Sequence, residues 1–301
     1  MRFGKDADAT SDVKDLRTGG STSGFGSGGL SLPTGVKGAG GIVGVIMVLV
    51  VAFLSKGGGG GGDLTDILST GFPQASVAEG GQAGVTETAA DEDLRLFVSQ
   101  VFNDTQDVWD ELFDGAQVDY RKATLVLFDT PVPSGCGGAQ AAIGPHYCPP
   151  DDTVFIELGF FRELGTRFEA PGDFAQAYVI AHEMGHHVQN VLGVSDEVRR
   201  MQRNDPSREN EYSIRLELQA DCYAGVWARS AYTRDMLDPG DIDEALAAAA
   251  AVGDDRIQMQ ATGRVDPESW NHGSSEQRQR WFDEGYDSGR AGDCDTFSGD
   301  I

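Results

Sequence analysis

The sequence predicts an α+β fold, mostly helical with a small sheet, behind one N-terminal transmembrane helix. Three observations lead to this prediction. Residues 38–54 form an uncharged apolar stretch, residues 123–129 and 152–158 are rich in β-branched and aromatic side chains, and helical periodicity runs from residue 173 onward. A helix, then a few strands, then a block of helices is the order typical of α+β domains.

Residues 1–90 are predicted to lie outside the folded domain, which is expected at 91–301. Residues 1–37 are rich in Gly, Ser, Thr and Asp, a composition typical of disorder. Residues 38–54 are apolar on all sides and long enough to cross a bilayer. A cleaved signal peptide is the alternative, but the preceding segment is long and no small-x-Ala pattern follows closely. Residues 55–90, which open with a run of glycines, are expected to be a flexible linker.

Charges beside the apolar stretch predict its orientation. Basic residues are concentrated before it and scarce after it: Arg2, Lys5, Lys14, Arg17 and Lys37 precede it, and Arg95 is the first basic residue after Lys56. Basic residues stay on the cytoplasmic side of a membrane. The sequence therefore predicts a single-pass cell-membrane protein with a cytoplasmic N-terminus and an extracytoplasmic domain.

The overall charge excludes some partners. With 23 Lys and Arg against 48 Asp and Glu, the formal net charge is -25. Nucleic acid and anionic lipid would be repelled at long range, so no nucleic-acid partner is expected. Adaptation to a saline environment also produces an acidic composition. In that interpretation the acidic surface serves solubility and binds no particular partner.

The four cysteines include no CxxC pair, so a cysteine zinc site is not expected. In an oxidising compartment they predict two disulfides. The short intervening loop favours Cys136 with Cys148, which leaves Cys222 with Cys294. Four separate buried thiols remain the alternative.

Within the domain, residues 91–113 have apolar side chains at helical spacing, and residues 123–129 and 152–158 are expected to be strands. Residues 133–150 are expected to be a long loop. Four helices should follow, the first ending at Gly193 and the others at about 209–236, 241–260 and 274–285. Ser274 and Gln277 have the spacing of a capping box at the start of the last helix.

The segment His182-Glu183-Met184-Gly185-His186 concentrates unusual chemistry in an apolar helix. Residues four apart share a helical face, so His182 and His186 can bind one metal ion. Zinc accepts such ligands, keeps a position for water and lowers the pKa of that water. Glu183, beside this face, can accept its proton. Two core histidines bonded to backbone carbonyls are the alternative, and a structural role is expected for His187.

A catalytic zinc site needs a third ligand. Gln189 and Leu192 exclude the HExxHxxGxxH pattern. Further along, Glu217 and Asp221 are four residues apart and share a helical face. Glu217 can bind the metal, while Asp221 can accept the outer N–H of a ligand histidine. An ordinary acidic helix face is the alternative, although the neighbouring residues are apolar or small.

HExxH followed by ExxxD resembles the gluzincin-type zinc metallopeptidases. Stretches such as "MRFGKDADATSDVKDLR", "AHEMGHHVQNVLG" and "HGSSEQRQRWFDEGYDSG" more narrowly resemble the bacterial family called putative neutral zinc metallopeptidases. The resemblance implies one zinc ion per chain, held by His182, His186 and Glu217, with Glu183 as general base. It also implies a zincin-like core in which an edge strand borders the substrate cleft, for which residues 153–158 are the candidate.

Two further histidines have weaker assignments. In gluzincins a downstream histidine can donate a hydrogen bond to the oxyanion, and His272 is the candidate here. A loop histidine without a role is the alternative. His146, between the first two cysteines, is expected to be structural.

The leading functional hypothesis is a membrane-anchored zinc peptidase that hydrolyses peptide bonds in peptides or proteins outside the cytoplasm. One alternative is a non-catalytic membrane-anchored envelope module with a structural zinc site. Another is a module that binds a partner through its acidic surface or glycine-rich tail. Glu183 favours catalysis, because a structural zinc site needs no base beside an open position.

Overall fold

Four strands form a mixed sheet in the order β1-β2-β4-β3. The computed structural model describes residues 1–4, 7–17, 88–139 and 144–301. The strands are β1 Val13–Asp15, β2 Thr124–Phe128, β3 His146–Cys148 and β4 Thr153–Glu157. β1 is parallel to β2 and β2 to β4, whereas β3 is antiparallel to β4. The two predicted strands are confirmed as β2 and β4.

The prediction that residues 153–158 form an edge strand is wrong. β4 lies in the interior of the sheet, between β2 and β3, and the edge beyond it is β3. Part of the expected loop 133–150 therefore folds back onto β4. The chain reverses through a short 3-10 turn, Pro149–Asp151, followed by Asp152 in the left-handed region. A three-residue strand is too short to show the alternation by which strands are recognised in a sequence.

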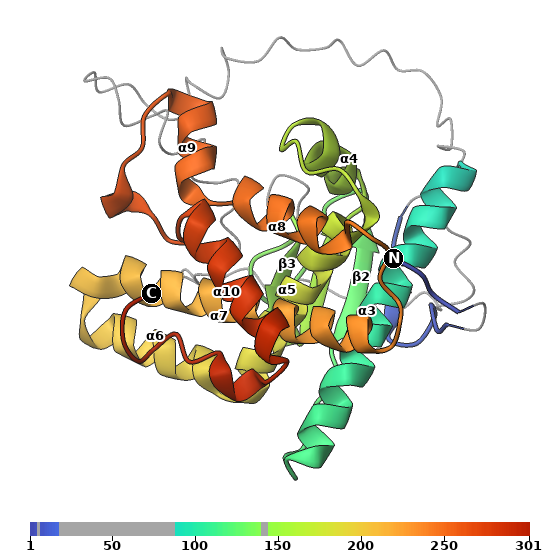
Figure 1. Ribbon diagram of the computed structural model, residues 1–301, viewed down its shortest axis with the longest axis horizontal. Helices are drawn as coiled ribbons and strands as arrows, with labels where there is room; N and C mark the ends of the chain where they lie inside the picture. Colours follow the sequence, from blue (N-terminus) through green and yellow to red (C-terminus); the bar gives the residue numbers. More distant parts are fainter. Residues whose placement is uncertain (5–6, 18–87, 140–143) are drawn as a thin grey trace, which may run out of the picture.

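The described residues also form eight α-helices, several of which lie to one side of the sheet (Figure 1). They are α3 Ala89–Gly115, α4 Gly159–Thr166, α5 Asp173–Val191, α6 Val194–Asn204, α7 Glu209–Thr233, α8 Asp241–Ala251, α9 Asp254–Thr262 and α10 Ser275–Ser288. The structure is thus mostly helical with a small mixed sheet, as an α+β fold requires. The predicted capping box of α10 is confirmed, since Ser274 and Gln277 exchange both hydrogen bonds.

The helix expected at 241–260 is broken in two. A Cβ atom at Gly253 would lie 2.5 Å from the backbone nitrogen of Ser275, so the chain approaches α10 too closely there for any side chain. α8 ends before this point and α9 begins after it at Asp254. Periodicity within one segment cannot reveal such a break, because a contact with a distant segment causes it.

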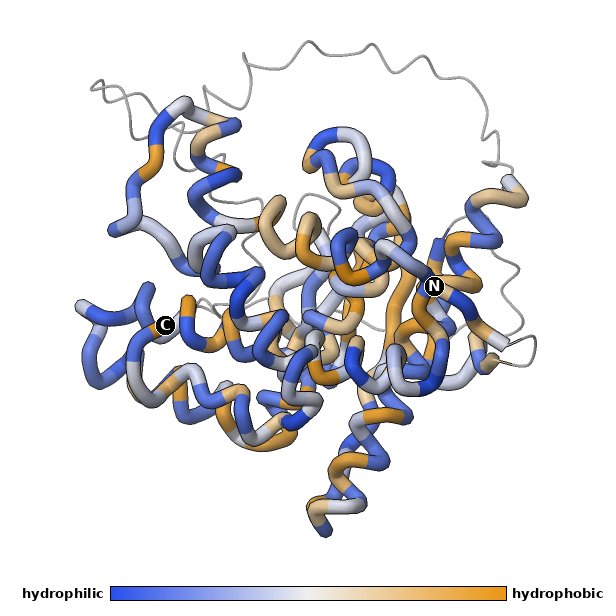
Figure 2. The backbone as a smooth tube through the Cα atoms, viewed as in Figure 1, coloured by the Kyte–Doolittle hydropathy of each residue, from blue (hydrophilic) through white to orange (hydrophobic). Residues whose placement is uncertain are grey.

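α5 occupies the centre of the molecule. It packs against α7, α8 and α3 and also contacts β3 and β4. Nearly every residue from Phe174 to Gln189 is buried, and Phe174 stacks on Trp227 of α7 with ring centroids 5.7 Å apart. Figure 2 shows apolar residues gathered around α5 and the sheet, whereas the outlying helices α6 and α9 are mainly hydrophilic. The predicted metal motif therefore lies on a helix that is buried over most of its length.

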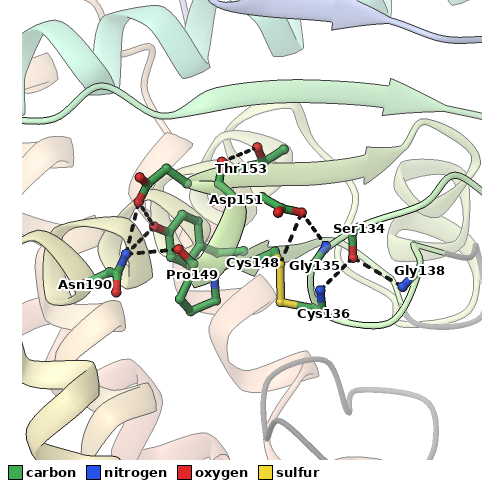
Figure 3. The surroundings of a disulfide bond; sticks show 11 residues. Ser134, Gly135, Cys136, Gly138, Cys148, Pro149, Asp151, Thr153 and Asn190 are labelled. Carbon is green, nitrogen blue, oxygen red and sulfur yellow. Dashed lines mark hydrogen bonds between the residues drawn. A yellow bond between two sulfur atoms is a disulfide. The ribbon is translucent and has the colours of Figure 1, made fainter. Parts of the chain in front are cut away.

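Two disulfides join the four cysteines, Cys136 with Cys148 and Cys222 with Cys294. Both predicted pairings are confirmed. The first ties the segment before β3 to the start of the β3–β4 turn (Figure 3). The second joins the middle of α7 to the chain after α10. Each bond thus restrains a segment that has little secondary structure of its own.

The expectation that residues 1–37 are disordered is wrong for residues 1–4 and 7–17. This segment lies alongside α3 and supplies β1 to the sheet (Figure 1). The expected membrane span, 38–54, and nearly all of the expected linker fall outside the described residues. Among the helices that the structure does describe, none combines the length and the apolar character needed to cross a bilayer.

Candidate metal centre

α5 and α7 bring the three predicted metal ligands together. Nε2 of His182 lies 3.2 Å from one carboxylate oxygen of Glu217, and Nε2 of His186 lies 3.4 Å from the other. Possible donor atoms of all three residues lie within 4.8 Å of one another. The imidazoles are buried, whereas 18% of the Glu217 side chain is exposed. One side of the cluster is therefore open to solvent.

These distances fit a tetrahedral zinc ion. Ligand atoms at about 2.0–2.1 Å from zinc stand about 3.3 Å apart in tetrahedral geometry. The two contacts to Glu217 agree with that spacing, and two imidazoles plus one carboxylate are a donor set of catalytic zinc sites. Three protein ligands leave the fourth position for water or substrate.

The charges of the cluster favour a cation. Burial opposes protonation of His182, but the carboxylates of Asp221 and Glu217 raise its pKa to about 9. Burial also opposes ionisation of Glu217, yet His186, His182 and His272 hold the pKa of its carboxyl well below the ordinary value. The cluster thus attracts protons when no ion is bound, and a metal ion must compete with them.

Asp221 sets the orientation of His182. Its Oδ1 lies 2.8 Å from Nδ1 of His182, as predicted, and accepts a hydrogen bond of 2.5 Å from the Tyr178 hydroxyl. Arg278 donates to both carboxylate oxygens, from Nε at 2.8 Å and from Nη2 at 2.9 Å. Burial raises the pKa of Asp221, but Arg278 and His182 outweigh it and lower the pKa to about 2.

Sequence reasoning missed Tyr178 and Arg278. Both are almost completely buried, and an arginine at such a position needs a partner for its charge. Arg278 lies on the same stripe of α10 as the buried residues Trp281, Phe282 and Gly285. An arginine on the apolar stripe of an amphipathic helix was therefore the available signal. Its partner on α7 could not be read from the sequence, because the pair is separated by 57 residues.

Close contacts between helices hold these groups in place. A Cβ atom at Gly185, inside the motif, would lie 2.8 Å from the Ala220 carbonyl oxygen of α7. At the crossing of α7 and α10, a Cβ atom at Gly285 would lie 1.9 Å from the Cys222 carbonyl oxygen. Only glycine permits these approaches. They bring Glu217 and Asp221 within reach of α5, and Arg278 within reach of Asp221.

Glu183 and His272 both lie near the predicted ligands. Glu183 follows His182 on α5, is 4% exposed and is close enough to His186 to help raise the pKa of that imidazole. His272 precedes α10 and is near enough to Glu217 to help lower its pKa. The structure thus brings Glu183, Asp221 and His272 into the neighbourhood of the three predicted ligands.

Asp254 is a further residue that the sequence did not reveal. Its Oδ1 lies 3.1 Å from Nδ1 of His272, and its Oδ2 accepts the backbone N–H groups of Asn271, His272 and Gly273. Burial raises the pKa of Asp254, but the contacts with His272 and these amides lower it below the ordinary value. Because Nδ1 of His272 is engaged by Asp254, Nε2 is the ring nitrogen that remains available.

His187 and His146 have structural surroundings, as expected. The ring nitrogens of His187 lie 3.0 Å from the Tyr147 hydroxyl and 2.6 Å from the Arg121 carbonyl, and burial lowers its pKa to about 4. His146 stacks on Phe155 of β4. These contacts, together with the hydrogen bonds from Asn190 of α5 shown in Figure 3, fix β3 beside the metal helix.

A mixed α+β domain in which neighbouring helices present two histidines and a glutamate defines a protein with an HExxH-type metal site. The chain belongs to the putative neutral zinc metallopeptidase family, whose model matches residues 1–297. It is 41% identical over 292 residues to the Escherichia coli (strain K12) "Uncharacterized protein YpfJ", covering 96% of each chain. It is 45% identical over 235 residues to the Mycobacterium tuberculosis (strain ATCC 25618 / H37Rv) "Uncharacterized protein Rv2575", covering 74% of this chain and 78% of the relative. No solved structure matches it.

Proposed function

We propose that this chain is a zinc peptidase that hydrolyses peptide bonds in peptides or proteins, on a zincin-like core. The observation that carries the proposal is the placement of Glu183. It adjoins a three-ligand cluster with one open side, where a structural zinc site would have no use for a buried base. The family assignment supports the same reaction class.

The roles of the side chains follow from their positions. A zinc ion bound by His182, His186 and Glu217 would polarise the scissile carbonyl and acidify a water molecule. The Glu183 carboxylate accepts a proton from the attacking water and passes it to the leaving amine. Nε2 of His272, oriented by Asp254, donates a hydrogen bond to the oxyanion. β3, the edge strand near α5, replaces β4 as the strand that borders the substrate.

The two disulfides support a location outside the cytoplasm. Such bonds form and persist in oxidising compartments, and all four cysteines are paired. We therefore keep an extracytoplasmic domain as part of the proposal, with residues 38–54 as the candidate contact with the cell membrane.

The test compares variants of the full chain for zinc content and for cleavage of an unbiased peptide library. Glu183→Gln should retain zinc and the fold but lose at least about 10²–10⁴-fold in hydrolysis, because general acid–base assistance is lost. Glu217→Ala should lose zinc as well as activity, since it removes a ligand. Glu111→Gln, at an exposed position of α3, is the matched control.

A parental rate of hydrolysis in Glu183→Gln would overturn the peptidase proposal. Zinc retained by a protein that cleaves no peptide would instead favour the second candidate, a non-catalytic envelope module with a structural zinc ion.

A further inference from the structure

A row of buried amides connects His186 to the disulfide-bonded tail. Nδ1 of His186 lies 2.9 Å from Oε1 of Gln189, one turn further along α5. Nε2 of Gln189 donates to Oε1 of Gln219 at 3.1 Å, and Nε2 of Gln219 donates to the Cys294 carbonyl at 2.9 Å. Gln189 is fully buried and Gln219 is 6% exposed. Both side chains are therefore shielded from bulk solvent.

The direction of each hydrogen bond is fixed by backbone carbonyls. Nε2 of Gln189 also donates to the Leu216 carbonyl at 2.7 Å, which can only accept. The amide oxygen Oε1 of Gln189 must therefore face His186 and accept a hydrogen bond from the Nδ1–H group of that imidazole. With the proton on Nδ1 of His186, the lone pair on Nε2 of the same imidazole is directed toward Glu217, where the metal would lie. The Cys294 carbonyl fixes Gln219 in the same way.

We propose that Gln189 and Gln219 are positioning residues for the metal site, through which the tail around Cys294 holds His186 in its binding tautomer and orientation. The inference rests on the proposed function only in taking zinc as the ion. His182 is oriented by a carboxylate and His186 by a neutral amide. The two ligands therefore have different outer partners, and only the second depends on the tail.

The test measures zinc affinity by competition with a chelator. Gln189→Met, which keeps length and volume, should weaken zinc binding about 10–100-fold. Gln219→Met should also weaken it, although Gln219 touches no ligand. Gln202→Met is the matched control: this buried glutamine of α6 likewise donates two hydrogen bonds, to Glu209 and Ser213. The absorption spectrum of the cobalt-substituted protein should change in the first two variants and not in the control.

Zinc affinity in Gln189→Met and Gln219→Met equal to that of the control would overturn the proposal. So would equal losses in all three, because a general packing effect would then explain them. The readout is independent of hydrolysis, so a failure of the peptidase proposal in Glu183→Gln leaves this test intact.

A separate set of contacts concerns the N-terminal segment. β1 pairs with β2 in register from Val13↔Leu125 to Asp15↔Leu127. The pairing is extended at both ends, by the Leu125 amide donating to the Asp12 carbonyl and by the Leu16 amide donating to the Leu127 carbonyl. β1 is thus an integral strand of the sheet that lies beside the metal helix.

Other parts of the segment are attached to helices. Phe3 packs edge-to-face on Phe97 of α3, with ring centroids 6.0 Å apart. Gln106 of α3 donates to the Asp12 side chain and accepts from the Ala123 amide. It thereby links the N-terminal segment to β2. Ala9 is buried, with 7% of its surface exposed.

From these contacts we infer that residues 1–17 and the metal domain lie on the same side of the membrane. A strand cannot pair with a sheet across a bilayer, because its backbone groups must meet those of its neighbour directly. Strand exchange between copies changes nothing, since each copy has the same topology. This inference replaces the predicted single pass through the membrane, because one span in either orientation would put the two parts on opposite sides.

Two native lysines test the inference. Lys14, in β1, and Lys122, just before β2, are both exposed. Intact spheroplasts would be treated with a membrane-impermeant amine reagent, and labelling would be measured for each lysine by mass spectrometry. We expect the two lysines to be labelled together. Labelling of Lys122 with protection of Lys14, followed by labelling of both after permeabilisation, would overturn the inference.

Discussion

Asp221 is hydrogen-bonded to His182, a predicted metal ligand, on one side and to a buried arginine on the other. Arg278 is only 1% exposed, and it also donates to the Val252 carbonyl and the Tyr178 hydroxyl. The guanidinium therefore neutralises a carboxylate that would otherwise be costly to bury beside the metal site. Substituting a residue that orients a metal ligand without touching the metal commonly lowers metal affinity by about 10–100-fold.

We predict that Arg278→Met destabilises the fold and weakens zinc binding. Breaking a buried ion pair leaves an uncompensated charge and costs about 3–5 kcal/mol in the free energy of unfolding. Unfolding in urea and chelator competition would measure the two effects. Arg280→Met, two residues along the same helix and exposed, should show neither, and equal losses in both variants would contradict the prediction.

We also predict that substitutions at His272 lower the rate of catalysis without removing the zinc ion. His272→Ala should lower kcat by about 10²–10³-fold, the usual loss when one oxyanion donor is removed. Asp254→Asn should lower kcat less, because the imidazole remains but loses its orienting carboxylate. Peptide hydrolysis and zinc content of both variants would be compared with the parent. Unchanged kcat in His272→Ala would assign this histidine a structural role.

At the scale of elements, the site depends on how closely α5 and α7 approach each other. His182 and His186 come from α5, while Glu217 and Asp221 come from α7. The helices meet at Gly185, where a Cβ atom would lie 3.0 Å from the Cα atom of Ala220. Backbone atoms cannot rotate away as a side chain can, so a larger residue must push the helices apart.

Gly185→Ala should therefore destabilise the protein by about 1–3 kcal/mol, the usual cost of overpacking, and should weaken zinc binding. In an open helix the same substitution is favourable by roughly 0.5–1 kcal/mol. Gly115→Ala should be neutral or stabilising, because a Cβ atom at this end of α3 would have no neighbour from another part of the chain within 4 Å. Thermal unfolding and zinc competition would decide, and a stabilised Gly185→Ala would contradict the close approach.

At the scale of the whole molecule, the disulfides enclose loops of different size. The partners are 12 residues apart in Cys136–Cys148 and 72 residues apart in Cys222–Cys294. The chain-entropy model assigns about 3 kcal/mol to the shorter loop and about 4 kcal/mol to the longer one. The longer loop also carries the Cys294 carbonyl to which Gln219 is bonded.

Replacing Cys222 and Cys294 by serine should thus destabilise the protein more than replacing Cys136 and Cys148. The first pair of substitutions should also weaken zinc binding, because the tail that supports His186 is released. Urea unfolding and zinc affinity of the two double variants would be compared. A larger loss of zinc affinity without Cys136–Cys148 would contradict this expectation.

Local patterns in the sequence were sufficient to predict several parts of this protein. The spacing of His182 and His186, and of Glu217 and Asp221, follows from helical periodicity, which needs no distant contact. α3, β2, β4 and the cap of α10 are long or distinctive enough to be recognised. The cysteine pairing followed from loop length.

Other features depend on contacts between segments that are distant in sequence. β1 and β3 are three-residue strands that exist because a longer neighbour supplies their hydrogen bonds. Tyr178, Gln189 and Arg278 matter because helices that are distant in sequence bring the Asp221 carboxylate or the Gln219 amide within hydrogen-bonding distance of them. The role of a buried polar side chain depends on its hydrogen-bond partner. Which partner comes within reach depends on how closely the helices pack at glycines such as Gly185, and no sequence pattern shows this.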